Sequence, residues 1–182
     1  CLYLTAPGKM CEHLFIHRMV GYVVTIGRSI PFIILMIALI PFTRLLIGTS
    51  IGTTAAIVPL SIAAIPFFAR ILEGKLLQLS DGIFLAADSM GLTPLQTIFR
   101  VIFPEVLPAF IHCITVLLVT LTEYSTMAGA IGGSGLGNTA LQYGFYQFNT
   151  KIMIEAIVIL IFIILMIQHF GDKLSQKFSY QT

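Results

Sequence analysis

The sequence predicts an all-α membrane protein, a polytopic bundle of spanning helices. Of its 182 residues, 57% are hydrophobic and only 10% are charged, and the mean hydropathy is +0.97. An ordinary soluble domain carries about 25% charged residues, so this composition excludes a soluble enzyme and a disordered tail. The apolar stretches are apolar on all faces and lack period-two alternation, which favours helices over a membrane barrel.

Four apolar segments approach the roughly 20 residues that a helix needs to cross a bilayer. They are residues 30–47, 54–72, 108–131 and 152–170. The first two contain or adjoin four prolines, Pro31, Pro41, Pro59 and Pro66. Each proline removes a backbone donor and bends or breaks its helix, so neighbouring helices must satisfy the freed carbonyl groups. This pattern is common in transporters and in other packed bundles.

The basic residues predict the orientation of these helices. Most of them lie on the side of the long connection 70–108, which the positive-inside bias assigns to the cytoplasm. The inner set is Lys9, Arg18, Arg28, Arg70, Lys75, Arg100, Lys173 and Lys177, and the outer set is Arg44 and Lys151. With four crossings, both ends of the single domain 1–182 are expected inside, including the C-terminus.

The N-terminal segment gives two further expectations. The chain begins with Cys1 and the apolar stub Leu2-Tyr3-Leu4, which reads as the tail of a lost helix and predicts a truncated start. His13 and His17 are four residues apart and could share a metal ion on a helix. Two such ligands are a weak signal, so a solvated cytoplasmic loop without a metal is the better interpretation.

Residues 80–104 form a connection with more local order than a linker needs. Ser80 or Asp81 can cap a helix over residues 83–90. Gly91 then suits the left-handed residue that ends a helix. The sequence therefore predicts a short cytoplasmic helix that stops at a glycine elbow.

A second short helix is predicted directly after this elbow. Thr93 and Pro94 suit the cap and the first helical position, and Gln96 can close a capping box. The arrangement resembles a DNA-binding helix-turn-helix, but Arg100 is the only basic residue nearby and the net charge is just +2. No nucleic-acid partner is expected. A protein partner fits better, because the small Ala86-Ala87 pair permits close approach.

The spacing within this connection carries a family resemblance. Leu85-Ala86-Ala87 is followed after three residues by Gly91, and after nine more by Val101-Ile102-Phe103-Pro104. It resembles the EAA loop of ABC importer permeases: Glu-Ala-Ala, three residues, Gly, nine residues, Ile, any residue, Leu-Pro. The chain departs at Leu85, where Glu is usual. The resemblance implies ATPase coupling for Leu85, Ala86, Ala87, Asp88, Met90, Gly91, Leu92, Thr93 and Pro94.

Longer matches extend the resemblance over nearly the whole chain and make it similar above all to the methionine permeases. They cover residues 28–32, 38–44, 64–70, 124–133 and 135–137. The resemblance implies the type I ABC importer permease fold, whose five helices would here lack most of the first. It also implies a homodimer in the bacterial inner membrane, two copies of a cytoplasmic ATPase, and an extracytoplasmic methionine-binding protein. The chain would move methionine by alternating access.

Glu123 is the most informative single residue for a substrate path. A carboxylate inside a spanning helix is costly and normally faces the bundle interior or a water-filled path. In the family the stretch that follows it lines the translocation path, although the position of Glu123 is generally small. We expect a path lined by Glu123, Tyr124, Ser125 and Met127. The alternative is a structural Glu123 that is protonated or paired with a neighbouring hydroxyl.

The evidence for a nucleotide-binding site and for a serine protease is weak. The stretch Gly132-Gly133-Ser134-Gly135-Leu136-Gly137 follows no strand and lies on the outer side, so it suits a tight turn or a helix contact better than a nucleotide site. Ser134 lies beyond the outer end of its helix, whereas His112 and His169 lie near the inner face, too far for a hydrogen bond. We expect no catalytic residue.

The chain contains no Walker A sequence. No cofactor is therefore expected on this chain, and ATP and Mg would be bound by the partner ATPase. Two alternatives stay open for the function. One is a permease of the same fold for another small amino acid or an osmolyte, and the other is a passive channel or membrane scaffold.

Overall fold

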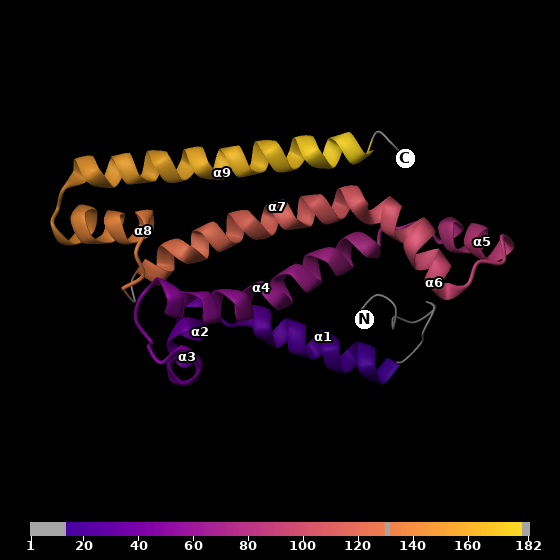
Figure 1. The fold of residues 1–182 in the computed structure, drawn as a ribbon, viewed down its shortest axis with the longest axis horizontal. Coiled ribbons are helices and arrows are strands. Elements are labelled where there is room, and N and C mark those ends of the chain that lie inside the picture. Colours follow the sequence, from indigo (N-terminus) through magenta and orange to yellow (C-terminus); the bar gives the residue numbers. More distant parts are fainter. Residues whose placement is uncertain (1–13, 130–131, 180–182) are drawn as a thin grey trace.

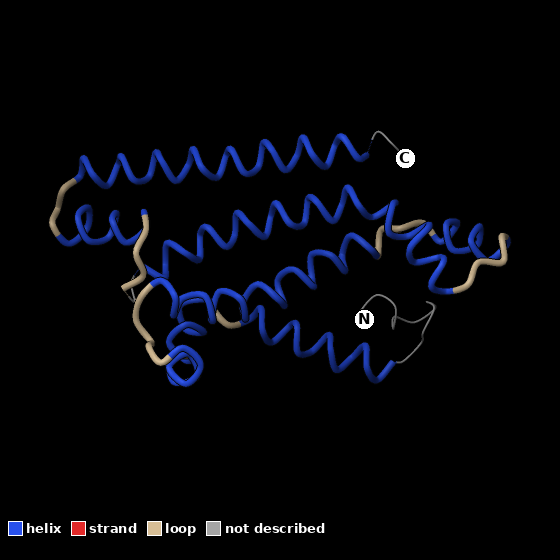
Figure 2. The backbone as a smooth tube through the Cα atoms, in the orientation of Figure 1, coloured by secondary structure: helices blue, strands red, loops and turns tan. Residues whose placement is uncertain are grey.

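The computed structural model describes residues 14–129 and 132–179. Within these ranges the chain is built from helices and connecting turns, with no strand (Figures 1 and 2). The expectations placed on Leu2–Leu4 and on His13 concern residues outside them. An all-α bundle is therefore confirmed for the described part of the chain.

Three long helices form the body of the molecule (Figure 1). They are α4 (Thr53–Leu76), α7 (Phe103–Ala128) and α9 (Thr150–Ser179). Helix α7 continues without a break from α6 (Pro94–Thr97) through the π-helical turns η1 (Ile98–Ile102), so Pro94–Ala128 is one helix of 35 residues. All three are long and apolar enough to cross a membrane.

Two predicted spans, 54–72 and 152–170, fall inside α4 and α9. The third predicted span, 108–131, begins inside α7, because this helix starts before Pro108. The earlier Pro104 also lies inside this continuous helix, directly after the π-helical turns η1. Polar residues in the preceding turns hide this part of the helix from a hydropathy window.

The prediction of one continuous helix over residues 30–47 is also wrong. The region is divided into α2 (Phe32–Ala38) and α3 (Ile40–Ile47), and it is preceded by α1 (Leu14–Ser29). The break inside this region falls at Leu39, directly before α3, whose first turn contains Pro41. The break between α1 and α2 falls at Pro31, which holds an extended backbone and disfavours helix at the residue before it. The α1 and α2 axes differ by 99°, so the two together make at most one bent span.

Helix α1 further corrects the solvated loop expected around His17. The apolar residues of α1 outnumber its charged ones, and its described side chains include exposed Phe15, Met19 and Tyr22. The charge pattern placed Arg18 and Arg28 together on the inner side, before the first span. They lie instead near opposite ends of this helix and so cannot share one loop.

A small core forms where α2 crosses α4 and α7. Phe32 of α2 stacks on Tyr124 of α7, with ring centroids 4.4 Å apart and planes within 2°. The buried residues are Phe32, Met36, Ala56, Ala63 and Ala128. Three of these are alanines, and small side chains allow helices to approach closely in a membrane bundle.

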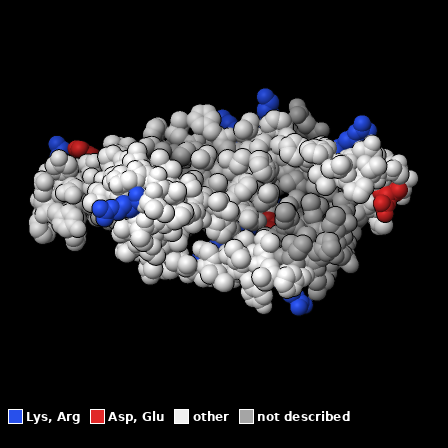
Figure 3. All heavy atoms as spheres, turned by 60° about the horizontal axis from the view of Figure 1, so that its bottom comes forward, with Lys and Arg blue, Asp and Glu red and all other residues white. Residues whose placement is uncertain are grey.

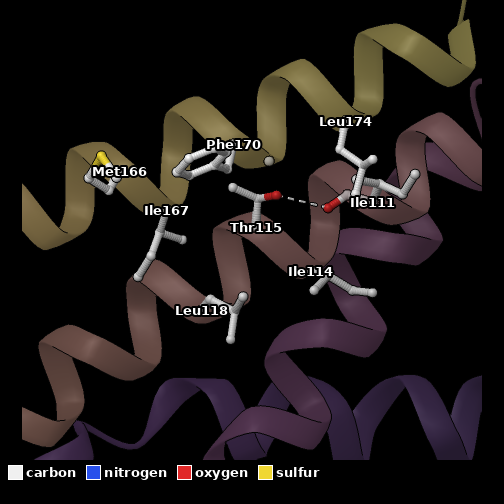
Figure 4. A pocket seen from close by; sticks show the side chains of 9 residues that line it. Ile111, Ile114, Thr115, Leu118, Met166, Ile167, Phe170 and Leu174 are labelled. Atoms are coloured by element: carbon white, nitrogen blue, oxygen red, sulfur yellow. Dashed lines mark hydrogen bonds between the residues drawn. The ribbon is translucent and has the colours of Figure 1, made fainter.

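Helices α7 and α9 approach each other closely where Gly171 faces Thr115. A Cβ added at Gly171 would lie 2.7 Å from the Thr115 Cβ, which no real pair tolerates. The Ser175 hydroxyl of α9 also donates to the Pro108 carbonyl of α7, at 2.8 Å. Beside this contact lies an apolar hollow of about 420 Å³ between the two helices (Figure 4).

The end of the bundle that holds α8 is closed by a compact turn. Helix α8 (Leu136–Thr139) and the π-helical turns η3 (Ala140–Tyr146) fold back against α9. A Cβ at Gly137 would collide with the backbone of Thr126, and the Ser134 hydroxyl lies 2.6 Å from that of Thr53. The interpretation of the glycine-rich stretch as a turn and close helix contact is confirmed.

Most of the surface seen in Figure 3 is uncharged, with Lys, Arg, Asp and Glu side chains mainly toward its margins and a few within it. Many large apolar residues on α9 are exposed, among them Ile157, Phe162 and Leu165. In lipid such a surface needs no further cover.

Candidate functional site

The predicted elbow lies at one end of the molecule, beyond the ends of α4 and α7 (Figure 1). Its first arm is α5 (Asp81–Ser89), which contacts η1. Gly91 has φ +67°, the left-handed conformation expected for it. The Gly91 N–H donates to the Asp88 carbonyl at 2.9 Å, and the Leu92 N–H donates to the Ala87 carbonyl at 3.2 Å. The predicted glycine stop is therefore confirmed.

The second arm begins with the predicted capping box. The Thr93 N–H donates to Gln96 Oε1 at 3.0 Å, and the Gln96 N–H donates to Thr93 Oγ1 at 3.4 Å. Pro94 occupies the first turn of α6. Ser80 is the residue before α5, as predicted, but its hydroxyl makes no capping hydrogen bond.

We expect Thr93→Ala to loosen the first turn of the second arm. Loss of a capping side chain costs about 1 kcal/mol, which corresponds to about fivefold faster amide hydrogen exchange at residues 95–97. Thr122→Ala is the matched control, because the Thr122 hydroxyl donates only to a carbonyl within α7. Equal exchange at residues 95–97 in the two variants would show that the capping box does not hold this turn.

The elbow has a buried face and an exposed apolar face. Ala87 is 2% exposed and Thr97 is also 2% exposed, so both point into the elbow. The predicted Ala86-Ala87 face is therefore corrected, because only Ala86 is exposed. The exposed large apolar side chains are Leu85, Met90, Leu95, Phe99 and Phe103. An apolar cluster of this kind at a polar end of the molecule is typical of a protein interface.

Leu95, Phe99 and Phe103 of this exposed row were not predicted from the sequence. They follow one another at intervals of four residues, which places them along one side of the helix. The buried residues of the same stretch are Thr97, Ile102 and Val106. The sequence alone does not predict this burial, because regular helical spacing would place Ile102 and Val106 on the same face as Phe99.

The remaining predicted elbow residues lie around this surface. Asp88 and Pro94 are exposed, and Leu92 is partly buried. At the adjoining end of α4, the buried Glu73 accepts a hydrogen bond from Arg70 at 2.7 Å. This ion pair was not singled out from the sequence, although its i, i+3 spacing on a helix is the signal for it.

The structure brings together only part of the predicted substrate path. Glu123 and Met127 are exposed and lie one turn apart on the same side of α7. Tyr124 is partly buried against Phe32. Ser125 is exposed but is turned about 160° from Met127, because each helical residue rotates about 100°. Ser125 therefore cannot share one wall with Met127 in a single copy.

The Glu123 carboxylate makes no hydrogen bond or ion pair with any described residue. Only its backbone carbonyl is engaged, by the Thr126 hydroxyl at 2.7 Å. The alternative, in which the Glu123 carboxylate pairs with the hydroxyl of Ser125 or Thr126, therefore does not occur among the described residues. A carboxylate left open in this way near the end of a spanning helix suits a wet surface or a contact with another molecule.

The residues considered for a hydrolase lie far apart. Ser134 contacts Thr53 at the end of the bundle away from the elbow. His112 Nδ1 instead lies 3.6 Å from Asp172 Oδ1 of α9, toward the end that holds the elbow. The structure therefore does not bring Ser134 and a histidine together.

Comparison with known proteins gives a consistent result. Residues 10–180 match the family described as "Binding-protein-dependent transport system inner membrane component". The chain is 49% identical over 180 residues to the probable D-methionine transport system permease protein MetI of Vibrio cholerae serotype O1, covering 99% of this chain and 80% of that protein. It is 45% identical over 179 residues to the corresponding protein of Pasteurella multocida, covering 98% and 82%.

A solved structure agrees with these relatives. A chain of the MetNI methionine ABC transporter, crystallised in an inward facing conformation, superposes with a TM-score of 0.93 and 44% identity. The match covers 97% of this chain and 82% of that chain. The helix arrangement described above is therefore the one seen in that transporter.

Proposed function

This chain belongs to the family of binding-protein-dependent transport system inner membrane components, and from this membership we propose that it carries methionine across the membrane by alternating access. It is a multi-pass inner-membrane protein and the permease subunit of an ABC importer, in which a separate ATPase subunit hydrolyses ATP. The observation that carries the choice of methionine is the 49% identity to a D-methionine permease along 99% of the chain.

The proposed assembly is a homodimer of this chain with two copies of the ATPase and an extracytoplasmic methionine-binding protein. ATP and Mg belong to the ATPase. The elbow and the end of α9 lie on the cytoplasmic side, which the last-turn Lys177 of α9 supports through the positive-inside bias. Figure 1 supports a common side as well, because α9 runs toward the end that holds α5 and α6.

The continuous helix Pro94–Ala128 provides a mechanical link between docking and transport. Its first turns carry the exposed Leu95 and Phe99, and its far end carries Glu123 and Met127. With about 1.5 Å per residue, its 35 residues span about 50 Å. When ATP closes the ATPases, a displacement of the docked elbow is carried along this helix to the path, as in rigid-body allosteric transitions.

The substrate assignment is tested by competition. In vesicles that contain this chain, its ATPase and its binding protein, methionine should suppress uptake of labelled methionine. Other small amino acids and osmolytes should not suppress it. Stronger suppression by one of these compounds would show that this compound, and not methionine, is the substrate of a permease with the same fold. Uptake that persists without ATP would instead indicate a passive channel.

We propose that Glu123 and Met127 line the path, with Glu123 attracting the ammonium group of a zwitterionic substrate. Glu123→Gln should lower methionine uptake severalfold while the amount of folded protein stays unchanged. Glu123→Gly should still transport, with an altered order of preference among methionine analogues with and without a free ammonium. Glu155→Gln is the control, because Glu155 is an exposed carboxylate near the start of α9. An unchanged preference together with lower thermal stability would make Glu123 a structural residue.

A further inference from the structure

Arg28 lies at a depth where a cation is expensive in a membrane protein. The neighbouring Gly27 packs against α4, where a Cβ added to it would lie 3.1 Å from Pro66 Cγ. Pro66 is the fourteenth of the 24 residues of α4, close to the middle of that spanning helix. Arg28 therefore leaves α1 near the mid-depth of the bundle. A charged side chain there is expected to face a water-filled path or a charged partner.

Arg28 lines a small hollow of about 150 Å³ between the end of α1, the start of α2, α4 and α7. The stacked Phe32 and Tyr124 rings line the same hollow, and Phe67 adds a third aromatic side chain. The Arg28 side chain is exposed rather than folded into the core. The hollow thus combines a guanidinium group with a rigid aromatic wall.

No acidic residue in the described part of the chain forms an ion pair with Arg28. The carboxylate of Glu73 is paired with Arg70 instead, and the carboxylate of Glu123 is within 4 Å of no described cation. The position of Arg28 in the last turn of α1 complements the helix dipole. That interaction is weaker than the cost of a cation at this depth, so it does not account for the residue.

We propose that Arg28 binds the carboxylate of the transported amino acid and that Phe32 and Tyr124 form the wall of this site. The planar guanidinium fork matches a carboxylate with two parallel hydrogen bonds. Glu123 precedes Tyr124 in the sequence but does not line the hollow, so this site concerns the carboxylate end of the substrate alone. This inference rests on the proposed amino-acid transport and adds the residue that distinguishes a free carboxylate from its uncharged derivatives.

The test measures binding of labelled methionine to the complete complex of this chain with its ATPase in nanodiscs, with the isolated ATPase subunit as the blank. Unlabelled methionine and methioninamide, which lacks the carboxylate, compete for the label. In the wild type, methioninamide should compete at least about tenfold more weakly, as expected for loss of a charge-assisted hydrogen bond. Arg28→Gln should bring the two competitors within about twofold of each other, and Arg28→Lys should restore part of the difference.

Arg44→Gln is the matched control. Arg44 is also an exposed arginine in the last turn of its helix, but it does not line the hollow. Arg44→Gln should keep the wild-type ratio of the two competitors. Because the ratio is measured within one preparation, a smaller folded yield does not alter it.

The outcomes separate this inference from the proposed function. An unchanged ratio in Arg28→Gln overturns the role of Arg28. Loss of dimer assembly at an unchanged ratio also overturns it and makes Arg28 a partner for a carboxylate of the second copy. Normal ATP-driven uptake by a wild-type complex that shows no saturable binding overturns the site but leaves the permease function standing. Absence of both uptake and binding in the wild type contradicts the proposed function itself.

Discussion

Gly91→Val should reduce ATP-driven uptake by more than tenfold while the ATPase still hydrolyses ATP. Gly91 has φ +67°, where a β-branched residue is a strained outlier. A Cβ at this position meets nothing within 4 Å, so the effect comes from the backbone and not from a clash. Strain of this kind costs about 1–3 kcal/mol and is relieved by turning α5 away from α6, which misplaces the docking surface.

The graded series at Gly91 makes this expectation specific. Gly91→Asn should keep most of the uptake, because asparagine tolerates the left-handed conformation, and Gly91→Ala should fall between Asn and Val. The measurement is the number of methionine molecules imported per ATP hydrolysed in reconstituted vesicles. Equal coupling in the valine and asparagine variants would show that the elbow conformation does not transmit the ATPase motion.

Gly171→Ala should destabilise the bundle although alanine favours helix formation. The added methyl group would overlap the Thr115 side chain of α7. Overpacking of this kind costs about 1–3 kcal/mol, against a gain of about 1 kcal/mol from helix propensity. We expect a lower melting temperature for the purified complex. Gly171→Leu should prevent the α7–α9 contact altogether and leave little folded protein.

Gly74→Ala is the matched control for Gly171→Ala. Gly74 also lies inside a long helix, but a Cβ there meets nothing within 4 Å. This variant should match or exceed the wild-type melting temperature, because only the propensity gain remains. If Gly171→Ala were as stable as Gly74→Ala, the close approach of α7 and α9 drawn in Figure 4 would not be maintained in the assembled protein.

Local signals in the sequence predicted the elbow well. Thr93 and Gly91 each require a particular backbone geometry, and that geometry depends on only a few neighbouring residues. The capping box and the left-handed glycine were therefore readable without the rest of the fold. The assignment of Ala87 to an exposed face failed, because its burial depends on how α5 packs against η1, a tertiary contact with no local signature.

The helix breaks near the N-terminus were less predictable. Hydropathy marked residues 30–47 as one span, since α2 and α3 are both apolar. Pro31 signalled a bend, but the 99° angle is set by the packing of Phe32 and Met36 against α4 and α7. The same packing brings Arg28 beside Tyr124. The charge pattern carries no information on this packing, and it therefore placed Arg28 with the inner loops and not near the middle of the bundle.

The predicted path residues show the same division between local and tertiary information. The polar patch after Glu123 was visible in the sequence, and its helical spacing already separates Ser125 from Glu123 and Met127. The stack of Tyr124 on Phe32 joins residues that are 92 positions apart, since 124 − 32 = 92. No pattern in one sequence predicts a contact of that kind.

ATP-driven methionine import through this chain can be measured in proteoliposomes with the ATPase inside and the binding protein outside. We expect labelled methionine to accumulate against its gradient. Omission of ATP, of the ATPase or of the binding protein should each stop this accumulation. Methionine that only equilibrates across the membrane at the same rate with and without ATP, although the ATPase is bound, would contradict the account.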